Sequence, residues 1–92
     1  MFLHLGNDVE VLIKHVIAIL DFEKTTISKI TREFLKTAQE EEFIINVSPN
    51  DLPKSFIITE EYHGSRVYIS PIAAATLQKR LLGSQNMRGI LV

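Results

Sequence analysis

Residues 12–29 read LIKHVIAILDFEKTTISK and change from strand character to helix character. Val16 to Leu20 is a short, unbroken apolar run rich in β-branched side chains, which predicts a central strand covered on both faces. A helix here would need greater length and a polar face. Thr25, Thr26 and Ser28 then supply hydroxyl groups suited to capping the N-terminus of a helix. The stretch therefore predicts a buried strand followed by a helix.

The helix that follows is expected to run to about Glu42. Its apolar residues recur at intervals of three and four, which places them on one side of a helix that faces a core. These residues are Ile27, Ile30, Phe34, Leu35 and Ala38. Phe34, between Ile30 and Ala38, is expected at the centre of this inward side.

Two short strands are predicted before the opening stretch. Phe2 to Leu5 and Val9 to Ile13 have strand character, and the residues Gly6-Asn7-Asp8 between them form a turn cluster. The two strands are therefore expected to form a hairpin.

Three strands and a second helix are predicted after the first helix. The strands are expected at residues 43–47, 55–59 and 66–69, with a two-proline loop at 48–53 and a turn at Gly64. Ser70-Pro71 predicts a helix start, with the serine as N-cap and the proline at the first helical position. This helix should run to Leu82 and end at Gly83. Its inward residues are expected to be Ile72, Leu77 and Leu81.

The predicted order is ββ-β-α-β-β-β-α, an α+β fold in which two helices cover one face of a small, mainly antiparallel sheet. A chain of 92 residues suffices for one core. We assign residues 1–83 to a single domain and residues 84–92 to a C-terminal tail.

Composition narrows the function classes. Ten Lys and Arg residues stand against eleven Asp and Glu residues, a formal net charge of −1. A compact nucleic-acid binder is usually more basic, so DNA binding would require the charges to segregate within the chain or several copies to combine their basic surfaces. The absence of cysteine excludes disulfides and thiolate metal sites and fits the reducing cytosol. No signal peptide and no membrane-spanning run are expected.

Motifs of catalysis are absent from the sequence. It contains no glycine-rich phosphate loop, no H-E-x-x-H and no nucleophile elbow. His4, His15 and His63 fall on separate elements without metal-ligand spacing, and the pair Asp21 and Glu23 is more typical of a solvated strand end. No catalytic residue, metal ion or cofactor is therefore expected. Lys14-His15 before the predicted central strand and Lys54 at the end of the two-proline loop remain as candidate binding residues, although isolated surface charges usually have no function.

Three segments carry a family resemblance: FLHLGND at residues 2–8, PKSFIIT at 53–59 and ISPI at 69–72. Together with their surroundings, residues 1 to about 80 resemble the RemA/RemB family of bacterial biofilm-matrix regulators, and its RemB branch in particular. The resemblance implies a non-enzymatic, cytoplasmic regulator. Similarity to the RemA branch further implies a DNA-binding transcriptional activator of matrix genes whose regulatory and oligomerisation domain, residues 1–83, assembles into rings. In such an assembly the attraction of many weakly basic patches to one duplex adds up.

The resemblance also implies where double-stranded DNA would be contacted: by Lys14, His15 and Lys54, which the strands would hold on one rim. RemA-like proteins carry an arginine at the position of His15 and an arginine-rich loop where this chain has Asp51-Leu52-Pro53-Lys54. A histidine carries little charge near neutral pH, so the charge available for phosphate is reduced. Two functions therefore stay open: a DNA-binding homo-oligomer, or a non-catalytic scaffold subunit that binds a basic paralogue.

Overall fold

A computed structural model describes residues 1–26, 29–41 and 43–84 of the chain. Its elements are β1 (Phe2–Gly6), β2 (Val9–Leu12), the 3-10 helix η1 (Ile13–His15), β3 (Val16–Asp21), α1 (Phe22–Thr26), α2 (Lys29–Glu40), β4 (Ile44–Asn46), β5 (Ser55–Glu61), β6 (Gly64–Ser70) and α3 (Ala74–Ser84). The predicted α+β class is confirmed.

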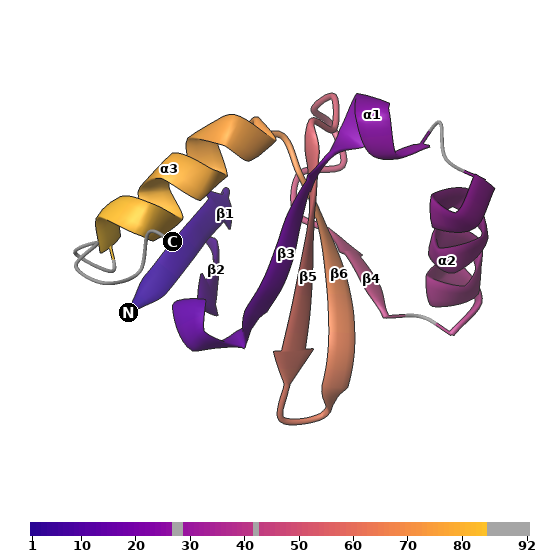
Figure 1. Ribbon diagram of the computed structural model, residues 1–92, viewed down its shortest axis with the longest axis horizontal. Helices are drawn as coiled ribbons and strands as arrows, with labels where there is room; N and C mark the ends of the chain where they lie inside the picture. Colours follow the sequence, from indigo (N-terminus) through magenta and orange to yellow (C-terminus); the bar gives the residue numbers. More distant parts are fainter. Residues whose placement is uncertain (27–28, 42, 85–92) are drawn as a thin grey trace.

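The strands form two sheets. The hairpin of β1 and β2 is a two-stranded sheet, and the other four strands pair in the order β3-β5-β6-β4. All pairs are antiparallel except β4 with β6, which is parallel. Figure 1 shows α3 beside the hairpin on one side of the larger sheet and α2 on the other. The second sheet and the parallel pair were not predicted, because the apolar pattern of a strand does not specify its neighbour.

The position of β3 corrects the first prediction. β3 is an edge strand that pairs only with β5 among the described strands, so it is not central. None of its residues is fully buried, and Ile17 is 61% exposed at a shift in register between Val16 and Ala18. The described strands covered on both faces are β5 and β6; in β5, Phe56 is 2% exposed and Ile57 is fully buried. β3 has five apolar residues of six and β5 only three of seven, so tertiary pairing, and not apolar content, decides which strand is central.

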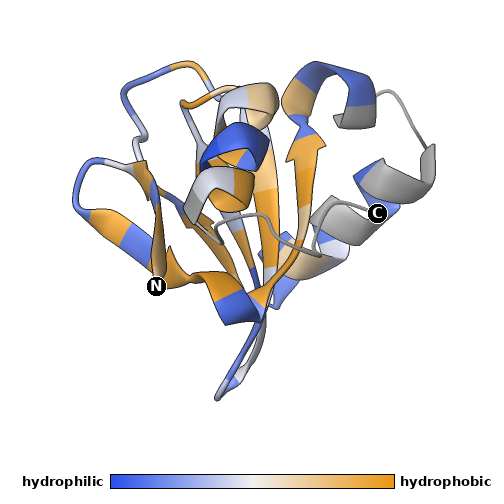
Figure 2. Ribbon diagram, turned by 60° about the vertical axis from the view of Figure 1, so that its left-hand side comes forward, coloured by the Kyte–Doolittle hydropathy of each residue, from blue (hydrophilic) through white to orange (hydrophobic). Residues whose placement is uncertain are grey.

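Two core clusters lie on opposite faces of the larger sheet. Successive strand residues point to opposite faces, so Ile57 and Phe56 belong to different clusters. On one face, Ile57 packs with the hairpin and with Leu77 of α3; on the other, Phe56 packs with Val67 and with Ala38 of α2. The expectation that both helices cover one face is therefore wrong. Figure 2 shows that hydrophobic residues are concentrated along the strands.

The helix boundaries differ from the predicted ones in three places. Asp21 accepts a hydrogen bond of 3.0 Å from the backbone N–H of Lys24 and caps the short helix α1, which was not predicted. α3 begins at Ala74 and not at Pro71. It includes Gly83 and ends at Ser84, a difference of the size common at helix ends. Leu77 is fully buried and Ile72 and Leu81 pack against the same cluster, which confirms the predicted inward residues.

Ser70 does not cap α3 because its hydroxyl group has another role. It is the last residue of β6, and its Oγ donates a hydrogen bond of 2.6 Å to the carbonyl oxygen of Leu5 in β1. The same Oγ accepts a hydrogen bond of 3.0 Å from the backbone N–H of Ile72. The side chain of Asn7 adds a second link, a 2.8 Å hydrogen bond to the carbonyl oxygen of Val47. These bonds hold the hairpin against the larger sheet.

Some predictions fall outside the described part of the chain. Ile27 and Ser28 belong to this group, as do the side chains of Thr25, Thr26, Ile30, Phe34 and Leu35. Residues 85–92 of the predicted tail also lie outside it. The assignment of these segments therefore stays a prediction.

Candidate nucleic-acid interface

Lys14 and His15 lie in η1, at the point where β2 ends and β3 begins. The buried side chain of Ile13 and a 3.0 Å hydrogen bond from its backbone N–H to the carbonyl oxygen of Met1 anchor this turn. Lys14 is exposed, and no ion pair is recorded for it among the described residues. His15 is half-buried. Among the described residues, the turn thus presents one exposed ammonium group without an ion pair and one half-buried imidazole.

Lys54 is positioned by the backbone on both sides of it. Its N–H donates a 2.8 Å hydrogen bond to the carbonyl oxygen of Ser70, and its own carbonyl accepts a 3.0 Å bond from Phe22. The preceding loop is tied by Ser48, whose hydroxyl donates to the carboxylate of Asp51 and whose carbonyl accepts a 3.0 Å bond from the Asp51 N–H. The side chain of Lys54 is exposed and projects from a backbone that hydrogen bonds hold on both sides.

The two lysines lie at opposite ends of β3. In the antiparallel pairing of β3 with β5, Val16 is opposite Thr59 and Asp21 is opposite Ser55. Lys14 lies just before Val16, at the first pair, and Lys54 lies just before Ser55, at the last pair. About five residues of strand, roughly 17 Å, therefore separate the two lysines. The expectation that they share one rim within a chain is therefore wrong. The antiparallel order of the strands causes this, because it brings the start of β5 to the end of β3.

A carboxylate, that of Glu61, lies close to His15. Its Oε2 accepts hydrogen bonds from the hydroxyls of Thr59 at 2.6 Å and Tyr68 at 2.7 Å, and Arg66 lies 3.9 Å from its Oε1. Burial raises the pKa of Glu61, but these hydrogen bonds and the charges of Arg66 and His15 outweigh burial and leave the pKa below its ordinary value. Burial and the bond to Glu61 raise the pKa of the Tyr68 hydroxyl. Glu61 therefore stays ionised and offsets positive charge in this region.

Lys54 also has acidic neighbours. Asp21 and Glu23 line the same hollow as Lys54, together with Pro53. Each candidate position thus combines a cation with nearby negative charge. Near each of them, the field available to attract a phosphate is weaker than the lysine alone would produce.

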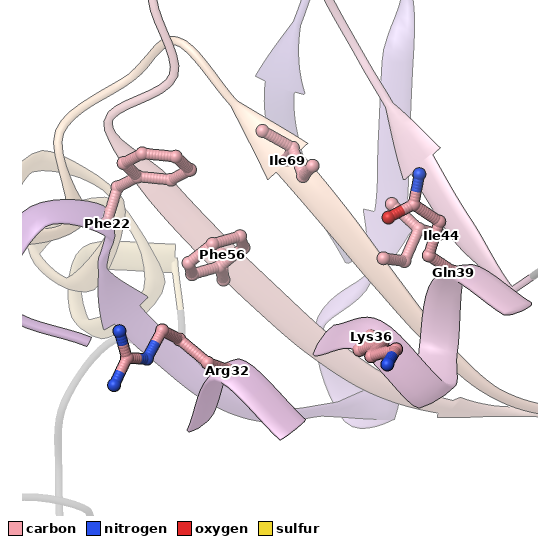
Figure 3. Close-up of a pocket in the computed structure, with 7 residues that line it drawn as sticks. All are labelled: Phe22, Arg32, Lys36, Gln39, Ile44, Phe56 and Ile69. Carbon is pink, nitrogen blue, oxygen red and sulfur yellow. The ribbon is translucent and has the colours of Figure 1, made fainter. Parts of the chain in front are cut away.

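Two further cations were missed by the sequence-based reasoning. Arg32 and Lys36 are exposed on α2 and line an open groove between that helix and the sheet, over Phe22 and Phe56 (Figure 3). No ion pair is recorded for either cation within the described residues. Their spacing of four residues, which puts both on one side of a helix, was the signal available in the sequence.

The remaining histidines do not extend the site. His4 is exposed, and its Nε2 hydrogen-bonds to the carbonyl oxygen of Asn7 at 2.6 Å. His63 is exposed at the turn between β5 and β6, beside Tyr62. Over the described ranges, no three His, Asp or Glu side chains are grouped as metal ligands would be. No helix in that part of the chain is both long enough and apolar enough to cross a membrane.

Comparison with known proteins adds a family relationship. Residues 2–81 match the RemA-like family, described as extracellular matrix regulatory protein A-like. Extracellular matrix regulatory protein B of Bacillus subtilis (strain 168) is 36% identical to this chain over 80 residues, which are 87% of this chain and 89% of that protein. The matched residues include all strands and most of α3.

Proposed function

The chain belongs to the RemA-like family of extracellular matrix regulatory proteins, and we propose that it is a cytoplasmic, DNA-binding transcriptional regulator of matrix genes that acts as a homo-oligomer. The observation that carries the proposal is the family match over residues 2–81. The exposed side chains of Lys14 and Lys54 also support the proposal, since backbone hydrogen bonds at Ile13 and Lys54 hold the segments that carry them. Contacts from such lysines would be to phosphate, which positions a protein on DNA and reads little sequence.

Oligomerisation is part of the proposal for an electrostatic reason. Two lysines neutralise at most about two phosphates, which predicts a slope of about −1.8 for the logarithm of affinity against the logarithm of salt concentration. A chain of net charge −1 gains little more from its overall field. Several copies on one duplex multiply the phosphate contacts. About six to ten phosphate contacts produce the steep salt dependence of regulators that bind DNA tightly.

Fluorescence anisotropy with a labelled duplex of about three helical turns tests the proposal. The affinity is measured between 50 and 200 mM salt, and the mass of the free protein is measured by light scattering. We expect an oligomer and a slope clearly steeper than −2. A monomer, or an oligomer without salt-sensitive DNA binding, would contradict the proposal.

A second candidate is a scaffold subunit of the same fold that binds a basic paralogue and has no direct DNA contact. The carboxylates beside the candidate cations favour it: Glu61 interacts electrostatically with His15, and Asp21 and Glu23 line the hollow next to Lys54. Such a subunit would show no salt-sensitive binding alone. It would change the affinity or the mass of the DNA complex when mixed with the basic paralogue.

A further inference from the structure

Two features of the described structure are open to solvent: the tip of the β5–β6 hairpin, at Tyr62 and His63, and the groove beside α2. We infer that the hairpin tip of one copy, led by Tyr62, docks into the α2 groove of a second copy. The inference deepens the proposed function, since it rests on homo-oligomerisation and specifies the surfaces that form it.

The groove has an apolar floor and a cationic rim. Its volume is about 310 Å³, and the rings of Phe22 and Phe56, with centroids 4.8 Å apart, form one end of the floor. Ile44 and Ile69 continue the floor and are only half-buried. A cavity of this size is at the lower end of those that hold small ligands and has room for one aromatic side chain.

The rim is formed by α2. Figure 3 shows Arg32, Lys36 and Gln39 projecting from this helix around the groove. Both cations are exposed, and neither has a recorded ion pair to another described residue. The groove therefore offers apolar contact, two positive charges and an amide to an occupant that is partly apolar and partly acidic.

The hairpin tip has the complementary chemistry. Tyr62 is 96% exposed, which is unusual for a large aromatic side chain, and the tip projects beyond the rest of the molecule in both views (Figures 1 and 2). Glu60, two residues before Tyr62, is also exposed, and its carboxylate accepts a 2.7 Å hydrogen bond from the Ser65 hydroxyl across the hairpin. Gly64, with a φ of +113°, allows the chain to turn here.

Docking would bury apolar groups of both surfaces and pair their charged groups. The ring of Tyr62 would pack on the apolar floor, its hydroxyl would reach the amide of Gln39, and Glu60 would pair with Arg32 or Lys36. A cation beside the tyrosine ring adds a favourable interaction. Tyrosine and arginine are also among the residues that most often dominate binding energy at protein interfaces.

The two features cannot meet within one chain. Phe56 and Ile69 are opposite each other near one end of the β5–β6 ladder, and Glu61 pairs with Gly64 at the other end. Five residues of strand, about 17 Å, separate the aromatic floor from the base of the tip. The contact is therefore head-to-tail between copies. Such a contact generates a ring if its rotation closes and a filament if it does not.

Complementary variants test the inference. Tyr62→Ala removes the aromatic group from the tip and leaves the groove intact, whereas Arg32→Glu with Lys36→Glu reverses the rim and leaves the tip intact. Each variant alone should be monomeric at concentrations where the wild type assembles, with an association constant at least roughly thirtyfold lower. An equimolar mixture should form a dimer of two chains and nothing larger, because only one intact tip and one intact groove can meet. Light scattering or analytical ultracentrifugation measures these masses.

Matched controls keep the outcome specific. Leu52→Ala removes an exposed apolar side chain from another loop, and Lys79→Glu with Arg80→Glu reverses two exposed cations on α3. Both should assemble as the wild type does, and circular dichroism should show every variant folded. If either test variant keeps the wild-type mass while folded, or if the mixture forms no dimer, the inference is overturned and homo-oligomerisation stands. A wild-type chain that stays monomeric at 100 µM overturns both.

Discussion

The hydroxyl of Tyr68 donates a hydrogen bond of 2.7 Å to Oε2 of Glu61 across the β5–β6 hairpin, and the hydroxyl of Thr59 donates to the same oxygen at 2.6 Å. The side chain of Glu61 is only 19% exposed, so water has limited access to both bonds. Hydrogen bonds to an ionised acceptor are stronger than those between neutral groups. The pair therefore links the protonation of one carboxyl to the stability of the central hairpin.

Glu61→Gln should lower stability at neutral pH, by roughly 1–2 kcal/mol, because two hydroxyls then donate to a neutral amide oxygen. The folded pKa of Glu61 is below its ordinary value of 4.5, so its contribution is complete above that value and is lost as pH falls through the folded pKa. The stability difference between wild type and variant should therefore shrink between pH 5 and strongly acidic pH. Urea unfolding at several pH values measures it. A difference that does not change with pH would show that the charge of Glu61 is not responsible.

Ser70→Ala should cost about 1–3 kcal/mol, since it leaves the buried carbonyl group of Leu5 without the serine hydroxyl. Ser70 is fully buried and joins the N-terminal hairpin to the larger sheet. Ser65→Ala, at an exposed position, is the matched control and should change stability by less than about 0.5 kcal/mol. Chemical denaturation followed by circular dichroism compares the two. Equal effects would rule out a special role for the Ser70 hydroxyl.

Leu77→Ala should destabilise the fold by about 2–5 kcal/mol, because Leu77 is fully buried between α3 and the sheet and its removal leaves a cavity. Leu52→Ala makes the same chemical change at a side chain that is 82% exposed and should have almost no effect. Thermal melts of both variants provide the comparison. A small effect at Leu77 would mean that α3 contributes little to the core.

Gly6→Ala should destabilise the hairpin, by roughly 1–3 kcal/mol. Gly6 has a φ of +124°, and an added Cβ would lie 3.3 Å from the ring of Pro71. Gly83→Ala should have the opposite sign and stabilise by up to about 1 kcal/mol, since Gly83 lies in α3 and an added Cβ there contacts nothing described within 4 Å. Equilibrium unfolding of both variants measures the two signs. Equal signs would indicate that the backbone at Gly6 can rearrange.

Lys14→Ala combined with Lys54→Ala should weaken binding to every duplex about equally, and the salt slope should become shallower by about one unit for each phosphate that the variant no longer neutralises. Lys79→Ala with Arg80→Ala, on the exposed face of α3, is the control with an equal change in charge. Affinities at four or more salt concentrations determine both slopes. If the control variant loses binding and the double lysine variant retains it, DNA binds at another surface.

Local sequence patterns predicted the elements but not their arrangement. The hairpin at residues 2–12, the strands β5 and β6 and the inward side of α3 follow from alternation, turn residues and helical periodicity, which act over a few neighbouring residues. α1 was missed because Asp21, which does end a strand, also caps the helix that follows, and only the first role was recognised. Ser70-Pro71 is typical of a helix start, yet the Ser70 hydroxyl bonds to Leu5, an interaction across 65 residues that no local pattern contains.

By itself, the sequence determined an α+β chain without recognisable catalytic motifs, with Lys14, His15 and Lys54 as candidate contacts. Tertiary structure alone decided that β3 is an edge strand, that α2 and α3 cover opposite faces, and that Lys14 and Lys54 lie at opposite ends of one strand. The physical reason is the range of the interactions. Periodicity reflects which side of an element is buried, whereas strand order and the meeting of distant charges depend on pairing between segments far apart in the chain.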